Sequence, residues 1–155
     1  MIVLDHPDQR LAVLAGDEAT VARVAGRQAL GTGWVSYQLQ ELVADLWEDP
    51  SVAHSLRSAA QVYAGRGEAL RSALRDHGIT ASGRSGFTCW VRVPDEDGVA
   101  SSLAEAGWAV APGQRFRIAA APGVRISFAT LEAPDAVSFA ADFARALRHR
   151  PSRLD

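Results

Sequence analysis

Hydrophobic and polar residues alternate most clearly over the seven residues that begin at Val124, and this alternation predicts a β-strand. Val124, Ile126 and Phe128 fall on one face, which we expect to lie in the core. Arg125 falls on the opposite face, among small and polar residues. Because a Pro-Gly turn directly precedes the strand, residues 116–119 are predicted to form its antiparallel partner.

The position of Arg125 allows two interpretations. Its planar guanidinium group can hold a carboxylate or a phosphate through two parallel hydrogen bonds. Alternatively, it is an edge-strand arginine that only keeps one face of a sheet in solvent. The alternation of the strand is the same in both cases, so both interpretations stay open at this point.

Helical spacing of apolar residues predicts three helices in the first half of the chain, at residues 17–30, 34–49 and 52–78. Asp17 is placed to cap the first helix, whose Val21 and Val24 are predicted to point inward. Gly65 and Gly67 weaken the third helix locally, which indicates either that a neighbouring element approaches closely there or that the helix kinks, and we favour the close approach. The apolar stripe along these helices is longer than a small sheet can cover, so another surface is expected to pack on it.

Alternation of apolar residues also predicts a strand at residues 87–93, and short apolar runs predict strands at residues 11–15 and 108–110. Two further helices are predicted at residues 94–107 and 134–147, and residues 81–86 are predicted to form a loop. This order of elements is typical of an α+β architecture. We therefore predict an α+β fold with helices packed on one side of a small, largely antiparallel sheet.

The composition is that of an ordinary globular domain of 155 residues, with 48% hydrophobic and 22% charged residues. A net charge of −2 predicts no basic surface for nucleic acid or membrane, and no apolar run reaches the length of a membrane span. The single cysteine, Cys89, alternates inward and is predicted to be an inert core thiol of a cytoplasmic protein. Four scattered histidines lack partners at metal-ligand spacing, so no metal site is predicted.

All sixteen basic residues are arginines, and the sequence contains no lysine. The chain therefore cannot form a Schiff base through a lysine side chain. The glycines at residues 31–33 lack the pattern of a phosphate-binding loop. The acidic residues 41, 45 and 48 share one helical face, which we interpret as solvated. No catalytic site emerges from these features.

Five stretches carry a resemblance to a known family, at residues 10–16, 30–40, 86–91, 110–116 and 124–129. They read RLAVLAG, LGTGWVSYQLQ, GFTCWV, VAPGQRF and VRISFA. In this order and spacing they resemble the C-terminal part of fold-type I pyridoxal-phosphate aminotransferases, and in particular the aminotransferase-like domain of MocR-type GntR transcriptional regulators. The resemblance implies the small C-terminal domain of such a protein.

The resemblance also implies roles for individual residues. Arg125 matches the family arginine that grips the substrate carboxylate. Pro112, Gly113 and Phe116 match the loop that approaches the substrate in the small domain. Arg10 matches the arginine that contacts the cofactor phosphate, and an ordinary surface arginine is the alternative at that position.

Pyridoxal phosphate is implied for the full-length parent and not for this chain alone. The Schiff-base lysine of the family would fall at Val3 or Ile2, and neither side chain can bind the cofactor aldehyde. The large domain of the family and a DNA-binding head do not occur in the sequence. We therefore expect no catalytic residues, no transaminase activity of this chain alone and no direct binding of nucleic acid.

The predicted organisation is an entry segment at residues 1–16, an aminotransferase-like small domain at residues 17–148 and a tail at residues 149–155. The main hypothesis is a domain or fragment of a MocR/GntR-type regulator, which binds a substrate or effector carboxylate and works with the missing large domain in a homodimer. One alternative is a stand-alone module, derived from that domain, that dimerises or binds a partner chain. The other is a carboxylate-binding regulator that acts without pyridoxal phosphate.

Overall fold

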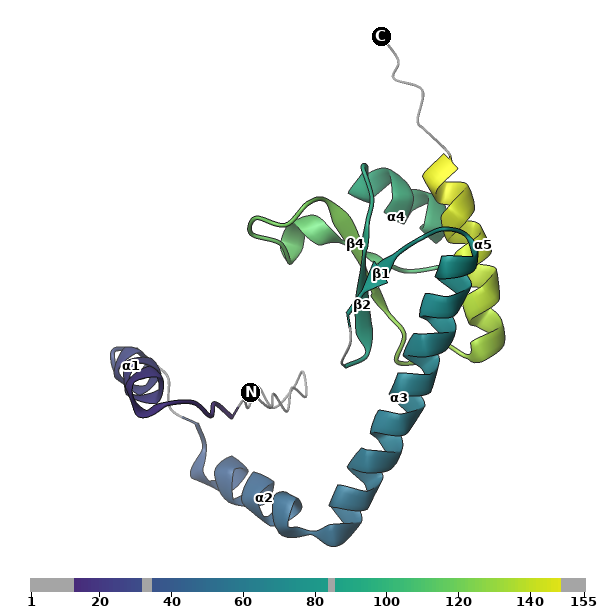
Figure 1. Ribbon diagram of the computed structural model, residues 1–155. Coiled ribbons are helices and arrows are strands. Elements are labelled where there is room, and N and C mark those ends of the chain that lie inside the picture. The colour runs from purple at the N-terminus through teal and green to yellow at the C-terminus, as the bar shows by residue number, and fades with distance from the viewer. Residues whose placement is uncertain (1–12, 32–34, 84–85, 149–155) are drawn as a thin grey trace. The chain divides into compact units, whose positions relative to one another are not determined.

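The computed structural model describes three stretches of the chain, residues 13–31, 35–83 and 86–148. The chain divides into two compact units, Met1–Ser55 and Leu56–Asp155, which are described separately below. Figure 1 labels most of the helices and strands of the two units. The division falls inside the predicted domain of residues 17–148, whose boundaries stay a prediction.

The first unit contains α1 (Glu18–Ala29) and α2 (Tyr37–Glu48), as the helical spacing predicted. The predicted cap of α1 is confirmed, because a carboxylate oxygen of Asp17 accepts a 2.9 Å hydrogen bond from the backbone N–H three residues later. Of the strand predicted before this helix, Val13 forms a single β-bridge. The rest of that strand is either irregular or lies outside the described residues.

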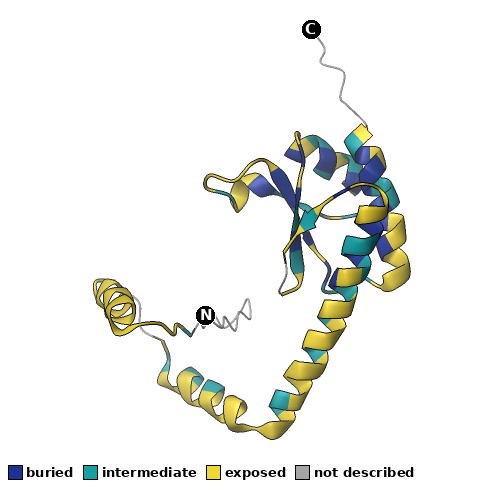
Figure 2. Cartoon of the chain, in the orientation of Figure 1, coloured by how far each residue is buried: buried dark blue, intermediate teal, exposed yellow. Residues whose placement is uncertain are grey.

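Neither α1 nor α2 has a buried residue. Val21 and Val24, which were predicted to point inward, are each 37% exposed, and Trp47 on α2 is 46% exposed. Figure 2 shows both helices largely exposed. An amphipathic helix gains stability in water mainly when another surface covers its apolar stripe. Nothing within the described part of the first unit covers the apolar stripes of α1 and α2.

The second unit is an α+β layer, in which helices pack on one face of a four-stranded sheet (Figure 1). Its elements are α3 (Pro50–Asp76, from residue 56 onward), β1 (Ala81–Ser82), β2 (Thr88–Arg92), α4 (Glu96–Glu105), β3 (Ala111–Pro112), β4 (Gly123–Ser127) and α5 (Ala133–Arg148). The strands lie in the order β1-β2-β4-β3, and every neighbouring pair is antiparallel. The predicted fold class is confirmed.

The core of the second unit lies between the sheet and the helices α3, α4 and α5. The predicted core face of the strand that contains β4 is confirmed, because Val124, Ile126 and Phe128 are at most 3% exposed. Cys89 on β2 pairs in register with Ile126 and is also 3% exposed. Since side chains alternate along a strand, Arg125 points to the opposite face, which we call the outer sheet face.

The predicted close approach at the glycines of α3 is confirmed at Gly67. A Cβ atom built there would lie 2.9 Å from Cζ of Phe128, so the ring of Phe128 packs directly against the helix backbone. A Cβ atom at Gly65 would meet no described atom within 4 Å. The two glycines therefore differ in their surroundings, although they lie two residues apart on one helix.

Three predictions about the sheet are wrong. Residues 116–119 do not form the partner strand of β4, which pairs with β2 and β3 instead, because a 3-10 turn (Gly113–Arg115) directly follows β3. The strand predicted at residues 108–110 occurs later, as β3, and β1 lies in the predicted loop of residues 81–86. β4 is an inner strand of the sheet, and this excludes an edge-strand arginine at Arg125.

Candidate functional site

Arg125 lies on β4 and its side chain belongs to the outer sheet face. Its Cζ atom stands 4.5 Å from the ring centroid of Phe116, in a cation–π contact. A guanidinium group that stacks on a ring by its face keeps its edge available for hydrogen bonds. Within the described residues Arg125 takes part in no ion pair. The side chain therefore presents a partly exposed cationic fork that fits a carboxylate.

Trp90 lies beside Arg125, because the two residues are register partners across β2 and β4. Its indole ring packs over the backbone of Gly113 and Gly123. A Cβ atom at Gly113 would overlap the ring, and one at Gly123 would lie 2.5 Å from Nε1, so only glycine fits at either position. Pro112 comes directly before Gly113 in the sequence and lies on β3. The structure thus brings the four described residues of the predicted substrate site to one region of the sheet.

Glu96, the first residue of α4, is the buried charged residue of the described chain, at 8% exposure. Its Oε1 accepts hydrogen bonds from Nε of Arg117 and from the backbone N–H of Gly123, both at 2.9 Å. Its Oε2 accepts from the backbone N–H of Gln114 at 2.7 Å. The pKa of this carboxyl lies below its ordinary value of 4.5, chiefly because the N–H of Gly123 donates to the charged form.

Sequence reasoning missed Glu96. Its spacing carried a signal, because Glu96, Val99 and Leu103 share the inward stripe of α4 and all three are buried. An acidic residue on an inward stripe predicts nearby donors, since a buried carboxylate is costly without them. The signal was hidden because acidic residues are also typical of the first turn of any helix.

A shallow pocket of about 270 Å³ adjoins Phe116 on the outer sheet face. It is lined by Ser82, Trp90, Arg92, Phe116, Arg117, Ala120 and Ala121. Arg92 is exposed and follows Trp90 by two residues on β2, so it shares the face with Arg125. Although the net charge of the chain is −2, Arg92 and Arg125 place positive charge together on this face, which favours an anionic ligand.

Other reactive groups of the described chain offer no competing site. Burial raises the pKa of the Cys89 thiol to about 11, which leaves almost no thiolate at neutral pH. No three His, Cys, Asp or Glu side chains gather as metal ligands within the described residues. None of the described helices has the length and hydropathy that a membrane span requires. Arg10, the predicted phosphate contact, lies outside the described residues.

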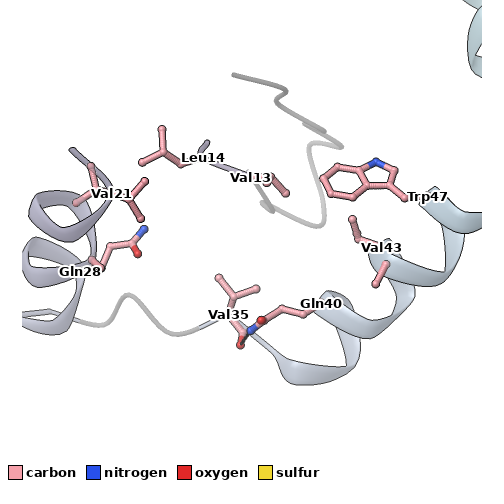
Figure 3. Close-up of a pocket in the computed structure, with 11 residues that line it drawn as sticks. Val13, Leu14, Val21, Gln28, Val35, Gln40, Val43 and Trp47 are labelled. Carbon is pink, nitrogen blue, oxygen red and sulfur yellow. Dashed lines mark hydrogen bonds between the residues drawn. The ribbon is translucent and has the colours of Figure 1, made fainter. Parts of the chain in front are cut away.

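The first unit holds an apolar cavity of about 380 Å³ between α1, α2 and the segment before α1. Figure 3 shows the residues that line it, which are Val13, Leu14, Val21, Val24, Ala25, Gln28, Val35, Gln40, Val43, Ala44 and Trp47. The side chains predicted to point into a core therefore border a cavity instead. Only two glutamines of this lining are polar, so the cavity favours an apolar occupant.

No protein-family model matches the chain. The chain is 37% identical over 143 residues to the vitamin B6 salvage pathway transcriptional repressor PtsJ of Salmonella typhimurium. The match covers 91% of this chain and 33% of the repressor, so the chain spans about a third of the length of that relative. This similarity connects the chain with regulators of the MocR/GntR type.

Solved aminotransferases share the fold. The aromatic aminotransferase from Pyrococcus horikoshii matches 92% of this chain and 39% of its own, with 22% identity and a TM-score of 0.69. The α-aminoadipate aminotransferase LysN from Thermus thermophilus matches 87% and 36%, with 22% identity and a TM-score of 0.62. An aminotransferase from Mycobacterium tuberculosis matches 66% and 28%, with 27% identity and a TM-score of 0.56. The chain therefore shares the α+β fold of the matching region of these aminotransferases.

The described residues do not assign a site to pyridoxal phosphate. The cofactor is held in the family by a lysine, and the sequence has none. The predicted phosphate ligand, Arg10, lies outside the described residues. Among the described residues, Arg125 and Phe116 offer a cationic group on an aromatic ring, a combination that fits an organic anion.

Proposed function

We propose that this chain is the ligand-binding small domain of a MocR/GntR-type regulator, in which Arg125 binds a carboxylate of the substrate or effector. The contact between Arg125 and Phe116 carries the proposal, because it orients an inner-strand guanidinium on the outer sheet face. An oriented side chain loses less conformational freedom when a ligand binds. Pro112 pairs in register with Val124, the residue before Arg125, so it adjoins the backbone of the same strand.

The rest of the larger protein supplies the cofactor chemistry in this proposal. A lysine outside this chain binds pyridoxal phosphate, Arg10 contacts its phosphate, and the chain alone has no transaminase activity. The name of the PtsJ repressor refers to vitamin B6 salvage, and the LysN structure contains N-(5'-phosphopyridoxyl)-L-leucine. Both support a pyridoxal-phosphate parent. The parent acts in the cytoplasm as a homodimer.

Titration with sodium acetate tests carboxylate binding. In the ¹⁵N-labelled chain, the Nε–H signal of Arg125 shifts and saturates with acetate, and an equal concentration of sodium chloride does not reproduce the shift. Arg125→Lys keeps the charge and loses the fork, so the acetate response of the neighbouring Trp90 amide weakens. Arg145→Lys, on α5, is the matched control and leaves that response unchanged. An undiminished response in Arg125→Lys would refute the proposal.

A second candidate function is binding of a partner surface by the first unit. The exposed apolar side chains of α1 and α2 and the cavity between them favour it. We assign this surface to the remainder of the same larger protein, since the PtsJ relative is about three times as long as the matched region. Expressed alone, the chain then exposes the surface and associates through it.

Sedimentation velocity over a range of chain concentrations tests this second candidate. The wild-type chain is expected to associate more as its concentration rises. Trp47→Asp places a charge on the lining of the cavity and abolishes the association. Glu41→Gln alters an exposed residue of the same helix outside the lining and serves as the control. A chain that stays monomeric at every concentration contradicts the assignment.

A further inference from the structure

We infer that Glu96 is a positioning residue for the anion site, whose carboxylate holds the loop that sets Phe116 against Arg125. The inference rests on the proposed function of Arg125 and adds the residue on which the geometry of that site depends. Glu96 does not touch the ligand itself. It acts through the loop of residues 113–123, which leaves β3 and returns to the sheet at β4.

The carboxylate of Glu96 contacts this loop at three separate points. The backbone N–H of Gln114 donates to it near the start, Nε of Arg117 in the middle and the backbone N–H of Gly123 at the end. Phe116 lies between the first two of these points. One side chain therefore fixes both ends of the loop and the turn that carries the Phe116 ring.

Other contacts of the loop do not replace this restraint. Residues 116–122 are not part of a strand or helix, so no ladder of backbone hydrogen bonds holds them. Two backbone bonds join Phe116 and Arg117 to Gly113 and shape the turn, and one joins the end of the loop to the chain before α4, where the N–H of Val93 donates to the carbonyl of Pro122 at 3.2 Å. None of them ties the part of the loop that carries Phe116 to α4. The neighbouring carboxylate, Asp95, caps α4 by accepting from the N–H of Gly98. Loss of the Glu96 charge weakens all three hydrogen bonds, and in Glu96→Gln at least one of the three donors loses its acceptor, because the NH2 group of glutamine cannot accept.

Two measurements on Glu96→Gln test the inference. The first is the Nε–H signal of Arg125, which the ring current of Phe116 displaces in the wild type and which moves towards its free position when the loop is released. The second is the dissociation constant for acetate, which rises by about tenfold, the lower end of what the loss of a supporting partner costs at metal sites. Glu96→Asp keeps the charge but shortens the side chain, so it is expected to show the same two changes. It replaces Glu96→Gln in the test if that variant does not fold.

Asp142→Asn is the matched control. Asp142 is also a largely buried carboxylate, with a side chain 15% exposed, and it accepts a 2.7 Å hydrogen bond from Nε1 of Trp108. Its replacement lowers the melting temperature and leaves the Arg125 signal and the acetate affinity unchanged. This control separates a positioning effect from a general loss of stability.

The outcomes distinguish the inference from the proposed function. A Glu96 variant that melts at a lower temperature, with an unchanged Arg125 signal and acetate affinity, has only a structural role and overturns the inference. If the wild-type chain does not bind acetate, the proposed function fails, and the Arg125 signal alone then decides whether Glu96 positions Phe116. In that case, an Arg125 Nε–H signal that differs between the Glu96 variant and the wild type supports the inference, and an identical signal overturns it.

Discussion

Replacement of Gly67 by alanine is expected to destabilise the chain relative to the same replacement at Gly65. Both glycines lie in α3, and a Cβ atom at Gly67 would come 2.9 Å from Cζ and 3.0 Å from Cε2 of Phe128. Phe128 is 2% exposed, so its ring cannot turn away without disturbing the core. At Gly65 the added methyl group meets open space.

The magnitude follows from two opposing terms. Alanine improves helix propensity by about 1 kcal/mol at either position. Overpacking against Phe128 costs about 1–3 kcal/mol at Gly67 only. Gly65→Ala is therefore expected to stabilise the chain by up to about 1 kcal/mol, and Gly67→Ala to fall about 1–3 kcal/mol below it. The propensity term cancels in this difference, so the difference isolates the crowding at Gly67, which comes chiefly from Phe128 because the other close atom, Nη1 of Arg71 at 3.1 Å, ends a flexible side chain.

Equilibrium urea unfolding of both variants, followed by circular dichroism and by thiol labelling of buried Cys89, measures the difference. In thermal unfolding it corresponds to about 4–8 °C for each kcal/mol in a unit of this size. Phe128→Leu removes the ring atoms nearest Gly67, so the cost of Gly67→Ala is expected to shrink in that background. Equal stabilities of the two alanine variants would refute the packing argument.

Four further predictions follow from the same structure. Cys89 should resist Ellman's reagent at pH 8 in the native chain and react on unfolding, since burial raises its pKa to about 11; rapid native labelling contradicts this. Asp95→Ala should lower stability by about 1 kcal/mol in urea because α4 loses its cap, whereas Asp95→Asn should not. The lowered pKa of Glu96 means that its stabilising effect is present above pH 4.5 and is lost as the pH falls through the folded value. The melting temperature of the wild type should therefore fall more steeply below pH 4.5 than that of Glu96→Gln, and parallel curves contradict this. Phe116→Leu should weaken acetate binding, because it removes a cation–π contact worth about 0.5–1 kcal/mol; an unchanged dissociation constant contradicts it.

Local patterns carried the predictions that the structure confirms. The spacing of apolar residues located the helices, Asp17 located a cap, and the alternation of Val124 and Ile126 located the core face of β4. Each depends on residues within one or two turns of helix or along one strand. The order of five short stretches pointed to the family before any neighbour in space was known.

The predictions that failed depend on neighbours distant in the sequence. A Pro-Gly turn favoured residues 116–119 as the partner of β4, but β2 fills one side of that strand and β3 the other. Val21 and Val24 have the right spacing for a core, yet the described first unit has no surface to bury them. A sequence pattern shows which face is apolar, and it does not show what covers that face.

The sequence by itself determined the helices, the apolar face of the sheet, the absence of a lysine and the presence of Arg125 on the polar face of a strand. Only the tertiary structure decided that Arg125 lies on an inner strand, that Trp90 requires glycine at two neighbouring positions and that Glu96 holds the loop of Phe116. The physical reason is distance along the chain. Glu96 and Gly123 are 27 residues apart in the sequence, and their hydrogen bond exists only because α4 and β4 pack together.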